Sequence, residues 1–275
     1  MTALLAEKVK ATGHGVEISH LVKKFGRPGH EMLALDDVSL TVAPGEFVSV
    51  IGPSGCGKTT LFNIVSGILT PSAGRVQIDG VDTTGKPGHV GYMLQKDLLV
   101  PSLSALENIT LGARLHGRVS KAQKDAAAEM ARHYGLGDFL DHFPHAMSGG
   151  MRQRVALMRT LAFAKDVMLL DEPFGALDSQ TRLDMQQWLL RVWAETGSTV
   201  LFVTHDIDEA VFLADRVVVM SPRPGRVSEI LDVDLPRPRD VDVLTTEPFM
   251  ALKRRALDLI YGRASGILDS EGDAS

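Results

Sequence analysis

The sequence predicts an α/β fold in which strands and helices alternate around a mixed sheet with an antiparallel edge. Three patterns lead to this prediction. An apolar strand at 46–51 runs directly into a glycine-rich turn and a helix, apolar and helical stretches alternate again over 167–220, and the stretch from about 97 to 160 holds no good strand candidate. Alternating strands and helices are typical of a parallel sheet, so we expect the strandless stretch to be a helical insertion.

The first strands are expected at 16–21 and 38–42, where apolar and polar residues alternate. We expect them to pair antiparallel through the loop at 26–30. Short strands at 75–79 and 90–94 follow, and neither leads at once into a long helix. The front of the chain is therefore interpreted as a mixed sheet with an antiparallel edge.

A phosphate-binding loop is predicted directly after the strand at 46–51. Its pattern is GxxxxGK[ST], and a strand, a glycine-rich turn and a helix are the context that this pattern requires. Glycines let the backbone curl so that its N–H groups face an anion, and the helix, expected over 59–69, points its positive end at the same place. Lys58 is expected to reach the β- and γ-phosphates, and the Thr59 hydroxyl to bind Mg²⁺. The predicted loop consists of Gly52, Pro53, Ser54, Gly55, Cys56, Gly57, Lys58, Thr59 and Thr60.

Capping signals mark the helices of the predicted insertion. Ser104 is followed three residues later by Glu107, which is the pattern of a capping box, and 120–134 is an alanine-rich helix that ends at glycines. Residues 148–150, Ser-Gly-Gly, open another helix. A serine and two glycines at a helix start form an anion-binding end, although they are equally typical of a well-capped helix that binds nothing.

Chemically capable side chains follow the strands in the second half of the chain. Asp171 and Glu172 come directly after an apolar strand at 167–170, and His205 follows a strand at 199–203. In a parallel sheet, ligands bind beyond the carboxyl ends of the strands, so we expect these side chains to converge with the phosphate loop. Asp171 is expected to hold Mg²⁺ through a water, and Glu172 to orient or deprotonate the attacking water. Carboxylates in solvated loops also follow strands, so the acidic pair alone does not indicate a catalytic site. It does so here because a phosphate loop lies upstream.

The alternation continues with a helix over 181–193 and a strand at 216–220, after which prolines become frequent. One more strand is expected at 226–231. A short amphipathic helix follows, and its narrow apolar stripe favours packing onto its own domain over a membrane or partner surface. Residues 265–275 are polar and acidic and are predicted to be disordered. The apolar stripe consists of Phe249, Leu252, Ala256, Leu259 and Ile260.

Composition and charge limit the function further. The chain has 275 residues, enough for one large domain or two small ones, and a net charge of −5, which does not favour a nucleic acid as the main partner. Cys56 is the one cysteine, so no disulfide can form within the chain, which fits a reducing compartment. The N-terminus lacks the apolar core of a signal peptide, and no stretch reaches the ~18 apolar residues that cross a bilayer. At a membrane, we expect another chain to hold the protein.

These motifs, in this order, resemble those of ABC transporter ATPase subunits, from about residue 16 to 235. The family implies a dimer in which each ATP lies between the phosphate loop of one copy and the Ser-Gly-Gly helix start of the other. It implies that Lys58, Gln95, Glu172 and His205 form the catalytic set and that Thr59, Gln95 and Asp171 bind Mg²⁺. Further roles implied by the family are adenine stacking for Phe25, the signature for Ser148, Gly149 and Gly150, a contact across the dimer for Asp178, and a γ-phosphate contact for His205.

Two positions depart from the family pattern. The usual Leu-Ser-Gly-Gly-Gln signature has Met147 at its start and Met151 at its end, so the glutamine side chain is missing while the Ser-Gly-Gly backbone is kept. The adenine-stacking position holds Phe25 where tyrosine is common. A phenyl ring stacks on a base but cannot hydrogen-bond to it.

Residues 147–154 and the stretch Ser-Pro-Arg-Pro-Gly-Arg at 221–226 resemble the nitrate, sulfonate and taurine group of bacterial importers. Related importers of thiamine-precursor pyrimidines share the Gln-Lys-Asp found at 95–97. The resemblance implies ATP and Mg²⁺ as cofactors and a second copy, two integral-membrane permease subunits and, indirectly, a solute-binding protein as partners, at the cytoplasmic face of the inner membrane. The expected division is an N-terminal extension over 1–15, an ABC ATPase domain over 16–235 with a helical subdomain at about 97–160, and a C-terminal extension over 236–275.

Two other classes of protein stay open at this point. A soluble ABC ATPase that acts on nucleic acid or on the translation machinery shares the motifs, but such chains usually carry two cassettes or a long coiled-coil insertion. This sequence has a single set of motifs and no heptad run. A P-loop kinase or GTPase leaves Ser148 to Gly150 and His205 without a role.

Overall fold

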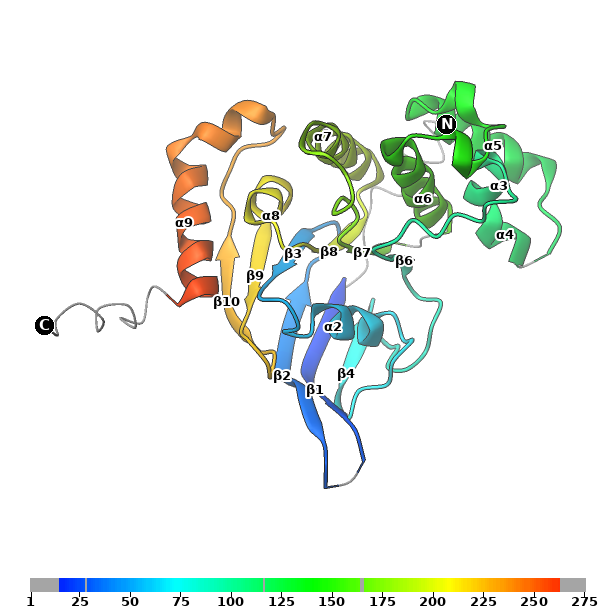
Figure 1. Cartoon of the computed structure of the whole chain (residues 1–275). Helices are drawn as coiled ribbons and strands as arrows, with labels where there is room; N and C mark the ends of the chain where they lie inside the picture. The colour runs from blue at the N-terminus through cyan, green and yellow to red at the C-terminus, as the bar shows by residue number, and fades with distance from the viewer. Residues whose placement is uncertain (1–14, 28, 116, 164–165, 263–275) are drawn as a thin grey trace, which may run out of the picture.

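The computed structural model describes residues 15–262 except residues 28, 116 and 164–165. In this part of the chain the strands form two sheets, and a group of helices lies to one side of the larger sheet (Figure 1). The last helix, α9, lies at the opposite edge of that sheet, beside β10 (Figure 1). The N-terminal extension predicted up to residue 15 and the tail at 265–275 fall almost entirely outside the described residues.

The larger sheet carries the predicted alternation of strands and helices. Within the described residues it has six strands in the order β10-β9-β3-β8-β7-β6, which are parallel except for β10, an antiparallel edge strand. Every residue of β3, β7 and β8 is buried, as in strands covered on both faces. The strands are β3 (Phe47–Ile51), β6 (Gly91–Met93), β7 (Val167–Asp171), β8 (Thr199–Val203), β9 (Arg216–Met220) and β10 (Val227–Asp232).

The N-terminal antiparallel strands form a second sheet, in the order β2-β1-β4-β5. The strands are β1 (Val16–Phe25), β2 (Met32–Val42), β4 (Ala73–Ile78) and β5 (Val81–Asp82). The prediction that the first two strands pair antiparallel is confirmed. The sequence did not separate the two sheets, because the strand at 47–51 lies between β2 and β4 in the chain but pairs with β8 and β9.

Two apolar cores lie on the two faces of the larger sheet. Alternate residues of a strand point to opposite faces, so Val48 and Val50 join a core with helix α2 (Lys58–Val65) and the antiparallel sheet. Phe47 and Ile51 join the other core, with the helices that follow β6. The helix expected over 59–69 ends earlier, because Ser66 caps α2 and Gly67 takes a left-handed φ of 78°. The strand that leads into the phosphate loop is therefore packed on both of its faces.

The middle of the chain is helical, and the described residues between 97 and 160 contain no strand, as predicted. The capping box of Ser104 and Glu107 is confirmed, and Ser120 forms a second one with Gln123. The elements are α3 (Ala105–Ile109), α4 (Leu111–Leu115), α5 (Lys121–His133), the short 3₁₀ turns η2 (Gly137–Phe139) and η3 (Pro144–Ala146), and α6 (Gly149–Phe163).

The C-terminal helix packs onto its own domain, as its narrow apolar stripe predicted. Phe249 and Ala256 are buried against the core, and Lys253 forms an ion pair with Asp208 at 2.7 Å. No helix in the described part of the chain is long and apolar enough to cross a membrane. The remaining elements are α7 (Ser179–Thr196), α8 (Ile207–Leu213), the 3₁₀ turn η4 (Val241–Thr245) and α9 (Glu247–Tyr261).

Candidate functional site

The predicted phosphate loop connects β3 to α2, and its glycines occupy positions that other residues cannot take without strain. Gly57 caps α2 with a left-handed φ of 106°, and a Cβ there would lie 2.7 Å from the Leu35 side chain. Gly55 has a φ of 77°. The loop therefore folds tightly over the N-terminus of α2, where helix N–H groups favour an anion.

Lys58 opens α2, and its side chain turns back over the loop. Its Nζ donates to the carbonyl oxygens of Gly52 at 2.8 Å and Pro53 at 3.2 Å, and it lies 3.7 Å from Cys56 Sγ. Both carbonyl partners are neutral. Phosphate oxygens would give stronger, charge-assisted hydrogen bonds, so the ammonium group is placed to exchange the carbonyls for a phosphate.

Asp171 ends β7 and is buried, with 4% of its surface exposed. Burial raises the pKa of this carboxyl group, while a hydrogen bond with Thr59 opposes the rise. The Tyr92 hydroxyl lies 3.5 Å from Asp171 Oδ2, and burial followed by the Asp171 charge raises the pKa of Tyr92. A carboxylate and a threonine hydroxyl in contact are hard oxygen donors of the kind that Mg²⁺ takes beside substrate phosphates, so these residues fit the predicted ion.

Glu172 follows Asp171 in a left-handed backbone conformation, with a φ of 47°. Such a conformation costs about 1–3 kcal/mol in a non-glycine residue, and such strain is concentrated at functional sites. The Glu172 N–H donates to the Val203 carbonyl at 2.8 Å, which holds the turn against β8. Its Oε2 accepts from Gln95 Nε2 at 3.0 Å and lies 3.3 Å from His205 Nδ1. Three predicted catalytic residues therefore meet at one carboxylate oxygen.

One cavity of about 540 Å³ is lined by part of the phosphate loop and by the residues that meet at the Glu172 carboxylate, whereas Asp171 is not among its lining residues. Its volume lies within the range of small-ligand sites. The predicted catalytic residues Lys58, Gln95, Glu172 and His205 all line it. The other lining residues are Ser54, Gly55, Gly57, Thr59, Thr60 and Arg223.

The Ser-Gly-Gly tip and Asp178 lie elsewhere, next to each other. The Met151 N–H donates to Ser148 Oγ at 3.3 Å, and a Cβ on Gly150 would lie 2.9 Å from the Thr181 side chain. Asp178 caps α7 by accepting from the Thr181 N–H at 3.0 Å, and this backbone hydrogen bond lowers the pKa of Asp178. Neither Ser148 nor Asp178 lines the cavity of the phosphate loop. A single chain thus presents two separate sets of predicted nucleotide contacts.

Comparison with known proteins identifies the family. The sequence model described as ABC transporter matches residues 35–175, just over half of the chain. The chain belongs to the ABC transporter family. As a member of this family it is an ABC ATPase, which binds ATP and hydrolyses it to ADP and phosphate.

Curated relatives place this ABC ATPase more closely. An uncharacterized ABC transporter ATP-binding protein of Methanocaldococcus jannaschii is 42% identical over 245 residues, which cover 89% of this chain and 91% of the relative. The taurine import ATP-binding protein TauB of Yersinia pestis is 46% identical over 201 residues, 73% of this chain and 79% of TauB. These similarities confirm the resemblance seen in the sequence and are consistent with the nitrate, sulfonate and taurine group.

Solved structures confirm the ABC ATPase fold. The dimeric structure of a bacterial ABC transporter cassette matches with a TM-score of 0.70 and 32% identity, over 80% of this chain and all of the cassette. A dimeric post-hydrolysis state of an ATP-binding cassette with bound ADP and Pi matches with a TM-score of 0.67, 32% identity and the same coverage. The mixed sheet, antiparallel edge and helices predicted from the sequence are those of this fold.

Phe25, the predicted adenine contact of this ABC ATPase, ends β1 and is 37% exposed. Lys23 Nζ lies 5.1 Å from the centre of its ring. Phe25 is not among the residues that line the cavity. Its exposed ring at the end of β1 can stack on a base, which is the role that the sequence predicts for it.

Sequence reasoning missed two residues of the site. Arg223 lines the cavity, and its Nε and Nη2 donate to the Gly55 carbonyl at 3.2 and 3.1 Å. Tyr92 contacts Asp171 from β6. Arg223 lies in the Ser-Pro-Arg-Pro-Gly-Arg stretch by which the sequence resembles the importer group. That resemblance could have indicated Arg223 as a residue of the site. Nothing in the sequence around Tyr92 distinguishes it from an ordinary strand residue.

Proposed function

We propose that the chain is the ATP-hydrolysing subunit of a bacterial importer and works as a homodimer. Each nucleotide would lie between the phosphate loop of one copy and the Ser-Gly-Gly tip of the other. The observation that carries this proposal is the separation of the two sets within one chain. Ser148 and Asp178 lie together, away from the cavity that holds Lys58 and Glu172. Solved cassettes of the same fold are dimers, which supports a second copy as the source of the missing contacts.

Hydrolysis needs three tasks that residues of the cavity can perform. Lys58 and His205 would hold the charge on the γ-phosphate as its bond breaks. Glu172 would accept the proton of the attacking water. Gln95, which already contacts Glu172, would keep that carboxylate in place. Thr59, Asp171 and Gln95 would hold Mg²⁺, which supplies further charge stabilisation when bound.

The first test of this proposal is the substitution Glu172→Gln. We expect ATP hydrolysis to fall at least about a hundredfold, because the general base is lost. ATP affinity should stay within about threefold, because the amide keeps the size of the carboxylate and one oxygen that accepts hydrogen bonds. Steady-state hydrolysis and calorimetric nucleotide titration measure both quantities. Full turnover in the variant would remove Glu172 from its proposed role.

The transported solute is proposed from the relatives. TauB of Yersinia pestis is named as a taurine import protein, so a small sulfonate such as taurine is the first solute to test. Nitrate and thiamine-precursor pyrimidines are the alternatives that the sequence resemblance names. In such importers the permeases and a solute-binding protein choose the solute, so uptake by the reconstituted complete transporter is the measurement that distinguishes the three.

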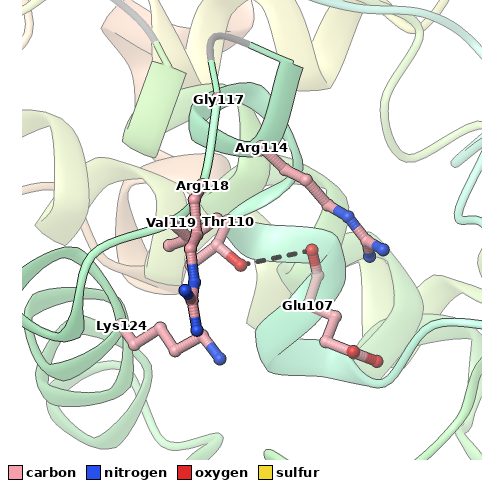
Figure 2. Close-up of a pocket in the computed structure, with 7 residues that line it drawn as sticks. All are labelled: Glu107, Thr110, Arg114, Gly117, Arg118, Val119 and Lys124. Carbon is pink, nitrogen blue, oxygen red and sulfur yellow. Dashed lines mark hydrogen bonds between the residues drawn. The ribbon is translucent and has the colours of Figure 1, made fainter.

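The helical insertion is the proposed docking face for two permease subunits at the cytoplasmic face of the inner membrane. Leu98, beside Gln95, is 54% exposed and Leu115 on α4 is 78% exposed. Between α3, α4 and α5 lies a cavity of about 330 Å³ (Figure 2). Figure 2 shows the side chains of Arg114, Arg118 and Lys124 around its opening. Leu115 follows Arg114, which lines this cavity, so α4 would present both an exposed apolar side chain and a basic side chain to the proposed partner.

Capture of the permeases tests this docking face. We expect Leu115→Glu to reduce co-purification from detergent-solubilised membranes at least about fivefold, since a carboxylate in an apolar contact must be desolvated. The control is Arg254→Glu, which also adds a negative charge at an exposed position but lies on α9. Equal capture of the Leu115 variant and the unaltered chain would remove the insertion as the docking face. If the unaltered chain captures no integral-membrane protein, the importer assignment fails.

A soluble ABC ATPase that acts on nucleic acid or the translation machinery is not favoured. The family model carries the name of the transporter family, and the taurine relative is an import protein. The net charge of −5 also gives no basis for binding a polyanion.

A further inference from the structure

The segment that follows β6 contacts the catalytic carboxylate at one end and the helix α6 at the other. Gln95 Nε2 donates to Glu172 Oε2 at 3.0 Å. Two residues later, Asp97 Oδ2 accepts from Arg152 Nε at 3.1 Å, across 55 positions of sequence. Three consecutive residues, 95–97, therefore connect Glu172 to α6.

Arg152 carries this connection to the Ser-Gly-Gly tip. Its Nη1 donates to the carbonyl of Met147 at 2.8 Å, and its backbone N–H donates to the carbonyl of Ser148 at 3.0 Å. The guanidinium is planar and rigid, so two of its nitrogens fix Asp97 and Met147 relative to each other. The position of the tip is thereby tied to the position of Asp97.

A second arginine holds the segment itself. Arg159 lies seven residues after Arg152, on the same face of α6. It donates to the backbone carbonyls of Asp97 at 2.5 Å and Leu98 at 2.8 Å. Asp97 Oδ1 also accepts from the Leu99 N–H at 3.2 Å. Because these contacts do not involve the carboxylate oxygen that meets Arg152, loss of the Asp97–Arg152 ion pair leaves the segment anchored.

The ion pair contributes little to the fold. The side chain of Arg152 is 37% exposed and that of Asp97 is 30% exposed, and ion pairs of this kind add little net stability. Its position is what distinguishes it. In the dimer under "Proposed function", Glu172 acts on the nucleotide of its own phosphate loop, whereas the Ser-Gly-Gly tip of the same chain covers the nucleotide of the other copy. The connection through 95–97 therefore joins one nucleotide to the other.

We propose that the Asp97–Arg152 ion pair is a positioning contact that couples the two nucleotide sites of the dimer. Occupation of one site moves or holds Gln95, and the ion pair passes this position to the Ser-Gly-Gly tip that covers the second nucleotide. This inference rests on the proposed dimer. Asp97 and Arg152 are positioning residues, since neither lines the cavity of the phosphate loop.

A double-mutant cycle tests the coupling in the full-length protein. The variants are Asp97→Asn, which keeps the size of the side chain, Arg152→Gln, which removes the charge and keeps a polar side chain, and the double variant. Hydrolysis is measured against ATP concentration, and nucleotide affinity is measured separately under conditions where the protein is monomeric. We expect each single variant to lose about tenfold in turnover, because each removes the charge-assisted hydrogen bond between Asp97 and Arg152. The Hill coefficient for ATP should fall from above 1 to about 1, and the double variant should be no worse than the singles.

The matched control is Arg255→Gln. It breaks the ion pair between Arg255 on α9 and Glu229 on β10, and both elements lie far along the chain from α6. We expect this control to keep turnover, Hill coefficient and nucleotide affinity. Monomer affinity should also be unchanged in the Asp97 and Arg152 variants, which a collapse of the nucleotide site would not allow.

Unchanged turnover and Hill coefficient in both single variants would overturn the inference, as would losses that add in the double variant. The dimer itself is tested apart from the ion pair, with Glu172→Gln as the only substitution. If that protein dimerises with ATP but the ion-pair variants behave as the unaltered chain does, the coupling fails while the proposed function stands. If it does not dimerise, the proposed function fails first.

Discussion

At the scale of single residues, the site is built from side chains whose present partners are easily exchanged. Lys58 donates to neutral carbonyls of its own loop, and Arg223 donates to the neutral Gly55 carbonyl and contacts Met32 Sδ. In the described part of the chain no carboxylate pairs with Arg223. A cation with neutral partners at the edge of a phosphate site raises the local affinity for anions.

The substitution Arg223→Gln tests this reading. We expect it to weaken ATP binding about tenfold, because a charge beside the polyphosphate is lost, with turnover at saturating ATP little changed. The control is Arg226→Gln in the same loop, because the Arg226 guanidinium pairs with Asp36 and does not line the cavity. Nucleotide titration by calorimetry compares the two. An equal loss in both variants would show that the shape of the loop matters and the charge of Arg223 does not.

The residues of the site differ in how far the sequence revealed them. Lys58, Asp171, Glu172 and His205 follow parallel strands, and such positions meet at one sheet edge whatever the loops do. Arg223 reaches the site from a loop and Tyr92 from the short strand β6, and no periodic pattern marks either position. The Asp97–Arg152 contact spans 55 residues and likewise depends on how α6 packs against the end of β6.

At the scale of elements, α8 follows the catalytic strand β8 and carries a buried carboxyl group. Glu209 is 4% exposed and accepts from Gln186 Nε2 of α7 at 3.0 Å. Burial raises the pKa of Glu209, hydrogen bonds from Thr204 and Gln186 oppose the rise, and the Asp206 charge adds to it. The burial of Glu209 between α7 and α8 therefore outweighs its hydrogen bonds, and the net effect is a raised pKa.

The pH dependence of stability follows from that shift. A carboxyl pKa that is higher in the folded state gives a stability contribution that is complete below the unfolded pKa and is lost as the pH rises through the folded pKa. Glutamine does not titrate, so Glu209→Gln does not undergo this loss. We expect the Tm of the variant minus the Tm of the unaltered chain to rise by about 2–4 °C between about pH 4.5 and about pH 8. Exposed Glu247→Gln is the control, with a flat difference. A flat difference for Glu209→Gln as well would contradict the assignment.

The C-terminal helix α9 tests the packing of elements. Phe249 is 1% exposed, whereas its neighbour Met250 is 44% exposed. We expect Phe249→Ala to lower the free energy of unfolding by about 3–5 kcal/mol, since it leaves a cavity against the core. Met250→Ala should change it by about 0.5 kcal/mol or less. Urea unfolding followed by circular dichroism measures both, and equal effects would mean that α9 does not pack as described.

The elements were largely predictable from the sequence because most of them carry strong local signals. A capping box fixed the start of α3, an alanine-rich run marked α5, and apolar runs of four residues marked β7 and β8. The division into two sheets was not predictable, because pairing partners are chosen by contacts distant in sequence. The early end of α2 was missed because Ile68 continues the helical spacing, although Gly67 already ends the helix.

At the scale of the whole molecule, the proposed function requires two copies that supply different residues to each nucleotide. One copy supplies the phosphate loop, the general base and the Mg²⁺ ligands, and the other supplies the Ser-Gly-Gly tip. The structure keeps these two sets apart within one chain. Coupling through residues 95–97 then gives each copy a means of responding to both nucleotides.

The most direct measurement is the molar mass of the Glu172→Gln protein with Mg-ATP, by light scattering across a range of protein concentrations. The account predicts a dimer with Mg-ATP, a monomer without nucleotide, and a monomer in both conditions when Ser148→Arg is added to block the tip. A Glu172→Gln protein that binds ATP yet stays monomeric at every concentration, and also beside its membrane partner, would contradict the central claim.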